Sequence, residues 1–409
     1  MRSFGADTRL PTLAVVLDII RERGAVSRVE LADATGLTQA TMTHAVRKLT
    51  ALGLVHEVGT APANRGTPRR LIGIREDACY MVGVQLDQFS AVGVVVDLAG
   101  RVVVRRDTPG SGMRPLASVV ADLAELVRTV LDEASVPPHK VLGIGLATYG
   151  SQDREAGIVI TPHPTAEWLG YPLAETLAAA TGLPVALEND ATAAGLGVQT
   201  AGGSGSSFAV VFMSGGIGGG VILDGHPYRG VTSNGVELGH ISVDALGEPC
   251  ACGNRGCLDP AAGPRVVVEQ ALEDPALAAR LGLGADTLTD FNRIGRAARE
   301  GDAEAAALVA ASAQRLAVAT VSMVNMFDVG RVVLAGHAFA ETGRAYRDVL
   351  QEVLHRSVYM RHVHTVEVDL AEDVTQAAAV GGAAVVLRNL LESPNPELRG
   401  VAADAEAGV

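Results

Sequence analysis

The sequence predicts a mixed α/β protein in which a small, basic N-terminal domain precedes a larger two-lobed body. Charge is the first reason, because residues 1–75 carry eleven basic and six acidic side chains whereas the remainder carries 22 and 40. The second reason is patterning: short amphipathic helices fill the first part. The third is that the rest of the chain runs twice through one plan of strands followed by helices.

Length and composition narrow the class of protein. A chain of 409 residues is long enough for two or three domains with a large buried core. It has no run of about 18 consecutive apolar residues and no apolar export segment at its start. Its four cysteines, three of them within eight positions, fit a reducing compartment. We therefore expect a cytoplasmic protein without a membrane partner.

Three helices are expected in the first 52 residues. Apolar residues recur at helical spacing between residues 10 and 23. The second helix begins after Ser27, which can form a capping box with Glu30, and it ends at Gly36. The third begins after Thr38, and its inward stripe consists of Met42, Ala45, Val46 and Leu49. Two helices joined by a short turn in this way predict a helix-turn-helix.

The other faces of the third helix carry short polar side chains and one basic side chain, which suit contacts with base edges and phosphates in a major groove. These residues are Gln39, Ala40, Thr41, Thr43, His44 and Arg47. A hairpin with a basic tip follows, with Arg65, Arg69 and Arg70 able to reach the DNA backbone or minor groove. Residues 1–75 thus predict a winged helix-turn-helix domain. Each helix alone could also be an ordinary packing helix, and the charge asymmetry alone would also suit a solvated surface.

The body repeats one order of elements. Strands are expected at 80–86, 90–98 and 100–107, then a helix, a strand, a helix, a strand and a helix from Asp190. The chain then repeats this plan, which predicts a first lobe over residues 76–200 and a second over residues 201–395, with a disordered tail at 396–409. Two such halves are typical of the actin and sugar-kinase (ribonuclease H-like) architecture, in which a ligand binds between the lobes.

A group of potential metal ligands lies in the second lobe: His240, Cys250, Cys252 and Cys257. Three thiolates and one imidazole favour a closed tetrahedral zinc site with a structural role. Gly253 and Gly256 would let the chain turn tightly enough for the sulfur atoms to converge. The alternatives are ordinary buried cysteines or a disulfide. A metal-bound His240 would leave its second ring nitrogen free, close to Glu237.

The chain resembles the ROK family of sugar kinases and transcriptional repressors over about residues 10–390. The resemblance rests on the segment from Gly216 to His240, on CACGNRGC and on LENDATAA, and the N-terminal domain places the chain with the regulators. In the family's kinases the residue matching Asp190 is the base that deprotonates the sugar. The resemblance implies a set of sugar contacts, namely Asn189, Asp190, Glu237, His240 and Asp259. From the residues alone, Asp190 could also be a plain helix N-cap.

The phosphate-binding loops depart from the family pattern. Where the family's kinases have an Asp and a run of glycines, this chain has Gln85 and Asp87-Gln88-Phe89. The second phosphate loop reads Ser214-Gly215, and His337 follows the adenosine-side glycine. Bulky or charged side chains there would block backbone N–H groups from an anion. We therefore expect no ATP binding and no enzymatic activity, with Asp190 a vestigial base. Asp259 replaces the family's usual Glu.

These features favour a sugar-responsive transcriptional regulator, most simply a repressor of carbohydrate-use genes, that binds operator DNA and a sugar or sugar phosphate. A homodimer or tetramer is expected because operators are commonly palindromic. Two other hypotheses stay open. One is an ATP-dependent sugar kinase with a regulatory DNA-binding domain; the other is a DNA-binding protein whose body only dimerises and responds to a partner protein or phosphorylation. Trp168 is expected either to line the cleft or to pack in a core.

Overall fold

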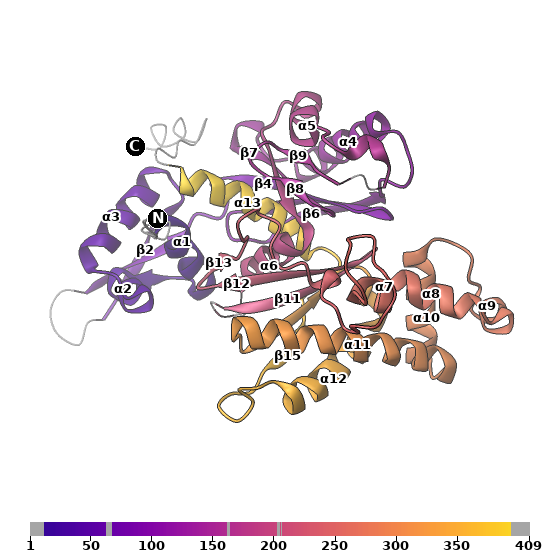
Figure 1. The fold of residues 1–409 in the computed structure, drawn as a ribbon. Coiled ribbons are helices and arrows are strands. Elements are labelled where there is room, and N and C mark those ends of the chain that lie inside the picture. The colour runs from indigo at the N-terminus through magenta and orange to yellow at the C-terminus, as the bar shows by residue number, and fades with distance from the viewer. Residues whose placement is uncertain (1–11, 63–67, 162–163, 203–204, 206, 394–409) are drawn as a thin grey trace, which may run out of the picture.

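A computed structural model describes residues 12–62, 68–161, 164–202, 205 and 207–393. Figure 1 shows a small N-terminal head beside two larger lobes, with one helix, α13, running between them. The predicted tail at residues 396–409 and the predicted DNA contact Arg65 lie outside the described residues.

The head has the predicted order of elements. They are α1 (Thr12–Arg23), β1 (Val26–Ser27), α2 (Arg28–Thr35), α3 (Gln39–Ala51), β2 (Val55–Ala61) and β3 (Arg69–Ile74). The capping box at α2 is confirmed, since the Ser27 N–H donates to the Glu30 carboxylate at 2.7 Å and Ser27 Oγ accepts from the Glu30 N–H. Gly36 ends this helix in the left-handed conformation, with φ of 67°. The hairpin of β2 and β3 forms the wing.

The first lobe is built on a five-stranded sheet in the order β10-β7-β4-β5-β6. Its elements are β4 (Tyr80–Leu86), β5 (Ser90–Asp97), β6 (Val102–Pro109), α4 (Leu116–Ala134), η1 (Pro138–Lys140), β7 (Val141–Thr148), β8 (Gln152–Asp153), β9 (Ile158–Val159), η2 (Ala166–Trp168), α5 (Leu173–Thr181), β10 (Val185–Asn189) and α6 (Asp190–Ala201). β4, β7 and β10 run parallel to one another, whereas β5 pairs antiparallel with both β4 and β6. The carboxyl ends of β4, β7 and β10 therefore meet at one edge, where ligands bind in such sheets.

The second lobe repeats this topology with the sheet order β13-β12-β11-β14-β15. Its elements are β11 (Phe208–Met213), β12 (Ile217–Leu223), β13 (His226–Pro227), η3 (Leu238–His240), α7 (Leu258–Ala262), α8 (Pro264–Leu272), α9 (Pro275–Leu281), α10 (Thr287–Glu300), α11 (Ala303–Phe327), β14 (Arg331–Ala335), α12 (Phe339–Ser357), β15 (Glu367–Leu370) and α13 (Ala377–Glu392). In each lobe the strand that comes first in the chain, β4 or β11, lies at the centre of the five-stranded sheet. The predicted repeat of one plan is thus confirmed.

Helix α11 passes the length and hydropathy criteria for a membrane span, with a mean hydropathy of 1.5 over its most apolar window. Half of that window is buried inside the protein. Val309, Leu316 and Met323 belong to the core of the second lobe. Core helices of folded domains meet the same criteria, so length and hydropathy alone do not distinguish a core helix from a membrane span.

Helix α13 follows the second lobe in the chain but packs against the first. A Cβ atom on Gly83 of β4 would lie 1.9 Å from the Ala379 carbonyl oxygen, and one on Gly145 of β7 would lie 1.7 Å from the Gly382 carbonyl oxygen. Only glycine allows backbones to approach so closely. The predicted boundary at residue 395 followed chain order, whereas these contacts attach α13 to the first sheet.

The head shares its hydrophobic core with the body. One cluster of buried side chains includes Leu17 and Leu49 of the head, Val94 of β5, and Ala383 and Leu387 of α13. Its members are almost completely excluded from solvent. Because apolar burial stabilises by about 25 cal/mol per Å², a shared cluster makes the head part of the folded body instead of a tethered module.

Candidate functional site

The outer face of α3 is polar and accessible. Thr38 caps the helix, and the predicted stripe of Met42, Ala45, Val46 and Leu49 is buried. Gln39, Ala40, Thr43, His44 and Arg47 are exposed and Thr41 is half-buried. Arg47 Nη2 lies 3.2 Å from His44 Nδ1, and this contact orders the basic end of the face. The surface therefore has the composition expected of a helix that enters a major groove.

The described part of the wing presents two of the three predicted arginines. Arg69 and Arg70 are both exposed at the start of β3. Arg70 Nη1 donates to the Glu57 carboxylate of β2 at 2.7 Å, so its charge is partly neutralised in the protein alone. An exposed ion pair of this kind contributes little to stability, and a DNA phosphate can replace Glu57 at small cost.

The predicted metal ligands converge. One ligand atom from each of His240, Cys250, Cys252 and Cys257 lies within 4.8 Å of the others. All four cysteines of the chain are free, so the disulfide alternative is not what the structure contains. Gly253 and Gly256 have φ of 95° and 58°, and a Cβ atom on Gly256 would lie 1.8 Å from the Asp244 carbonyl oxygen. The predicted need for glycine in this loop is confirmed.

The spacing of these atoms fits a zinc tetrahedron. Bonds of about 2.3 Å to sulfur place the corners of such a tetrahedron about 3.8 Å apart. The Cys252 and Cys257 sulfur atoms are 3.6 Å apart, and the Cys250 sulfur is 3.8 Å from His240 Nδ1. Three thiolates and an imidazole leave no open coordination position, so this group could hold a structural zinc ion.

Asn189 and Asp190 lie where β10 ends and α6 begins. Asn189 is the N-cap, and its side-chain oxygen accepts from the Thr192 N–H at 3.1 Å. The alternative that Asp190 is the cap is therefore wrong. Asp190 is buried and accepts from the Ala191 N–H at 2.8 Å. Burial raises the pKa of Asp190 to about 7, and the nearby charges of Asp87 and Glu237 act in the same direction.

The other predicted sugar contacts approach Asp190 from the second lobe. Asp259 Oδ1 accepts from the Ile217 N–H at 2.9 Å. A Cβ atom added to Gly216 would lie 3.2 Å from Asp259 Oδ1, and a Cβ atom added to Gly218 would lie 4.0 Å from Asp190 Oδ1. The glycine turn that leads into β12 therefore lies close to both carboxylate groups.

Glu237 and Asp259 are coupled to the metal group through the chain. Glu237 lies three residues before His240, and Asp259 lies two residues after Cys257. Burial raises the pKa of both carboxyls, and the charge of His240 acts in the opposite direction on each. If His240 binds a metal through Nδ1, its Nε2 faces away from the ion and can meet a ligand. A metal here would hold two carboxylate-bearing segments in place.

The segments that match the family's two phosphate loops contact each other directly across the two lobes. Asp87, at the turn between β4 and β5, is buried. Its Oδ1 accepts from the N–H groups of Phe89 at 2.6 Å and Ser90 at 2.7 Å. Its Oδ2 accepts from Ser214 Oγ of the second lobe at 2.5 Å, and the ring of Phe89 covers Gly215. A carboxylate thus takes the donors that could otherwise hold an anion.

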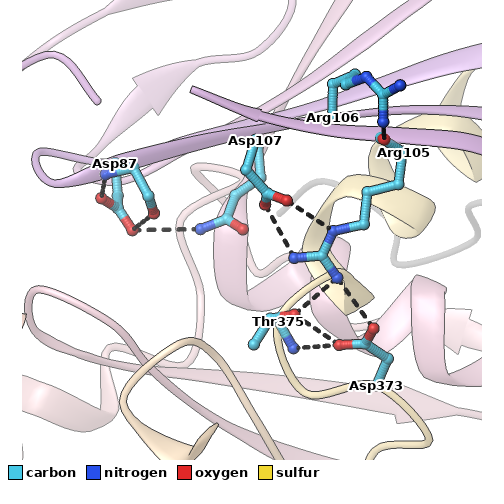
Figure 2. Close-up of polar contacts among 8 residues, drawn as sticks. Asp87, Arg105, Arg106, Asp107, Asp373 and Thr375 are labelled. Carbon is cyan, nitrogen blue, oxygen red and sulfur yellow. Dashed lines mark hydrogen bonds and ion pairs between the residues drawn. The ribbon is translucent and has the colours of Figure 1, made fainter. Parts of the chain in front are cut away.

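A second bridge between the lobes lies beside it. Figure 2 shows the Arg105 guanidinium of β6 between Asp107 on one side and Asp373 and Thr375 on the other. Arg105 Nη1 donates to Asp373 at 2.9 Å and to Thr375 at 2.8 Å. His337 is near these charges, and burial lowers its pKa. These contacts join the first lobe to the segment that leads from β15 into α13.

For Trp168 the structure decides between the two predicted roles, and for Glu188 it shows a role that the sequence analysis missed. Trp168 is buried in the core of the first lobe, with Tyr149 at a ring distance of 6.2 Å, so packing is its role. Glu188, directly before Asn189, was not singled out. It is almost fully buried and pairs with Arg154 at 3.1 Å and with Arg229 of the second lobe at 2.7 Å. A carboxylate in an apolar strand was the signal that could have identified it.

A winged helix-turn-helix that shares a core with a two-lobed, carboxylate-lined body defines a class of protein: a DNA-binding domain joined to a sugar-kinase-like fold. The chain belongs to the ROK family, whose model matches residues 81–389. A model described as winged helix-turn-helix DNA-binding matches residues 15–56. The predicted family and fold class are both confirmed.

The relatives include both repressors and sugar kinases. A xylose repressor of Caldicellulosiruptor bescii is 24% identical over 389 residues, which cover 93% of this chain and 96% of the relative. A glucokinase of Thermotoga maritima is 32% identical over 275 residues, covering 66% and 84%. Among solved structures, a ROK family transcriptional regulator described as a homologue of the Escherichia coli MLC protein has a TM-score of 0.68 at 22% identity, covering 98% of this chain and all of that one. This last likeness concerns the fold.

Proposed function

We propose that this chain is a sugar-responsive transcriptional regulator, most simply a repressor, that binds operator DNA through α3 and the wing. The observation that carries the proposal is the exposed polar face of α3 on a head whose core continues into the lobe that holds Asp190. The relative named a xylose repressor, which matches the chain from head to body, supports the same function. A DNA-binding regulator of this type acts in the cytoplasm.

The effector is a sugar or sugar phosphate bound between the lobes. Asn189, Asp190, Glu237, His240 and Asp259 are the proposed contacts. Sugars present hydroxyl groups that both donate and accept, and carboxylates read them through paired hydrogen bonds. Buried carboxylates penalise a ligand that lacks one of these hydroxyls, so the site can discriminate between sugars. Bound sugar shifts DNA affinity to the extent that it favours one arrangement of the protein over another.

We propose that His240, Cys250, Cys252 and Cys257 hold a structural zinc ion. The 3.6 Å and 3.8 Å separations of their ligand atoms support this proposal. When bound, zinc supplies a rigid crosslink and no open position for chemistry. The residues that it positions are Glu237 and Asp259, which bind the effector.

The protein is proposed not to bind ATP and not to be an enzyme, because Asp87 and Phe89 fill the side of the cleft opposite the sugar contacts. A sugar kinase is the second candidate, favoured by the buried Asp190, whose pKa of about 7 suits a general base, and by the glucokinase relative. A coupled assay of ADP release over a panel of sugars separates the two. Turnover above that of an Asp190→Asn variant would establish the kinase.

The operator and effector can be found together. Selection from a random duplex library, followed by fluorescence anisotropy at physiological salt, yields a preferred DNA site. Aldoses, N-acetylated sugars and their 6-phosphates are then tested for an effect on that affinity. We expect a homodimer, or a tetramer of two dimers, bound to a palindrome whose half-sites are about 34 Å apart. Absence of sequence preference would contradict the DNA-binding proposal.

Arg47→Ala tests the role of α3. Loss of one phosphate or base contact should weaken operator binding by about 5- to 150-fold, the range that corresponds to 1–3 kcal/mol. Sugar affinity, measured by calorimetry, should stay within about twofold because Arg47 is exposed on the head. A parallel loss of sugar affinity would show that the substitution disrupts the fold instead of the DNA contact.

A further inference from the structure

The last turn of α6 meets the head at a buried arginine. Arg388 of α13 is 7% exposed, and its Nη2 donates to Asp18 of α1 at 2.6 Å, to Gln199 of α6 at 3.0 Å and to the Gly225 carbonyl oxygen at 3.1 Å. Gln199 Nε2 donates to the same carbonyl at 3.1 Å. One guanidinium therefore joins the head, the first lobe and the second lobe.

A second contact attaches α1 to the first lobe beside this arginine. Arg21 donates from Nε and Nη2 to the Leu98 carbonyl oxygen, at 3.2 Å and 3.1 Å, and from Nη1 to Asp18 at 2.6 Å. The turn after Leu98 also touches α6, since a Cβ atom on Gly100 would lie 2.7 Å from the Thr200 side chain. Asp18 is thus held by two arginines, one from its own helix and one from α13.

Helices α6 and α13 form one rigid pair. A Cβ atom on Gly197 would lie 1.9 Å from the Ala377 carbonyl oxygen, and one on Gly381 would lie 1.6 Å from the Ala193 carbonyl oxygen. Backbones in direct contact cannot slide past one another without a clash, because packed interiors have no spare volume. A displacement at one end of α6 must therefore move α13 as well.

The two ends of α6 have different neighbours. Asn189 and Asp190 stand at its N-terminus in the cleft, and Gln199 stands nine residues later at the contact with Arg388. At 1.5 Å per residue the two ends are about 14 Å apart. The pair therefore spans the distance between the proposed sugar site and the head.

We infer that the α6–α13 pair transmits effector binding from Asp190 to the DNA-binding head, and that the Asp18–Arg388 contact is the joint through which the head responds. This inference rests on the proposed function. Asp18 and Arg388 are positioning residues, because they touch neither the sugar contacts nor the outer face of α3. Their loss should reduce the effect of sugar on DNA affinity while leaving each binding event in place.

The test compares wild type with Asp18→Asn in the full-length protein. Calorimetry measures sugar affinity, and anisotropy measures operator affinity without sugar and with saturating sugar. We expect sugar affinity within about twofold of wild type, and a ratio of the two operator affinities that is about five- to tenfold closer to one, at the low end of typical allosteric coupling. Glu133→Gln, which removes the Arg106–Glu133 ion pair on the surface of the first lobe, should leave the ratio unchanged.

A second variant guards against misfolding. Asp18→Leu combined with Arg388→Met replaces this ion pair, in which Arg388 is buried and Asp18 half-buried, by apolar side chains, an exchange that proteins often tolerate. It should fold and again lose the sugar effect. A wild-type ratio in either folded variant would overturn the inference. If wild type itself shows no sugar effect on DNA binding, the proposed function fails first, and this is seen before any substitution is made.

Discussion

The two sides of the cleft use carboxylates in opposite ways. On one side, Asp190 and Asp259 each accept one backbone N–H at Oδ1 among the described contacts. Their other lone pairs are left to accept from a ligand. On the other side, both oxygens of Asp87 are occupied by donors of the chain, from its own turn and from Ser214 across the cleft. A carboxylate whose lone pairs are already used stabilises the fold, whereas one with free lone pairs can bind a ligand.

The largest expected effect follows from removing a free acceptor. Asp190→Ala should weaken sugar binding by about 10- to 150-fold, since a hydrogen bond to a charged group contributes about 1.5–3 kcal/mol. Calorimetry with the effector found by the sugar panel measures this. Operator binding without sugar serves as the control for folding. Unchanged sugar affinity would remove Asp190 from the site and with it the contrast between the two sides.

Metal removal should act on the same side of the cleft. Cys252→Ser, or a chelator, should lower sugar affinity on the order of tenfold, because Glu237 and Asp259 then lose their common anchor. Operator binding should change less, since the head packs on α13 and β5. Returning zinc after chelation should restore sugar binding in wild type but not in Cys252→Ser. Equal losses of sugar and DNA binding would contradict this separation.

Sugar affinity should depend on pH. Because the pKa of Asp190 is raised to about 7, its carboxyl is mostly protonated at pH 6 and mostly ionised at pH 8. Sugar hydroxyls donate more strongly to the ionised form, so affinity should fall by up to about tenfold as pH falls from 8 to 6. Calorimetry at both pH values measures the change. In Asp190→Asn the dependence should be much smaller, and an equal dependence there would assign it to Glu237 or Asp259.

The smallest effect on sugar affinity is expected on the other side. Asp87→Ala should leave sugar binding within about threefold of wild type. It should lower the free energy of unfolding by about 1–3 kcal/mol, because buried N–H and hydroxyl donors lose their acceptor. Urea denaturation measures this. Asp107→Ala, which removes a neighbouring exposed carboxylate, should cost less than about 1 kcal/mol. Loss of sugar binding in Asp87→Ala would show that the two sides are not separate.

Local chemistry was readable from the sequence. The caps at Ser27 and Thr38, the buried stripe of α3 and the convergence of the metal group all follow from spacing over fewer than twenty residues. Spacing of this kind constrains the backbone directly, since periodicity and turn residues act on near neighbours. The carboxylates at residues 190, 237 and 259 were assigned by family resemblance. In the structure Glu237 is a nearby charge for Asp190, and the glycines at 216 and 218 lie close to Asp259 and Asp190.

Contacts between distant segments could not be read in this way. The sequence indicated that Asp87 was unusual but not that its partner is Ser214, 127 residues later. Nor did the sequence indicate that the glycines of α13 allow it to touch α6 and the first sheet. Such partners depend on how the whole chain packs, and a single sequence carries no direct record of that.

By itself, the sequence determined the features that short segments specify: the helix caps, the apolar periodicity, the basic charge of the head and the spacing of the cysteine cluster. Tertiary structure alone decided that the head and body share one core, that α13 returns to the first lobe, and that Asp18 meets Arg388 across 370 residues. The physical reason is that close packing and the pairing of buried polar groups are satisfied over the whole fold at once.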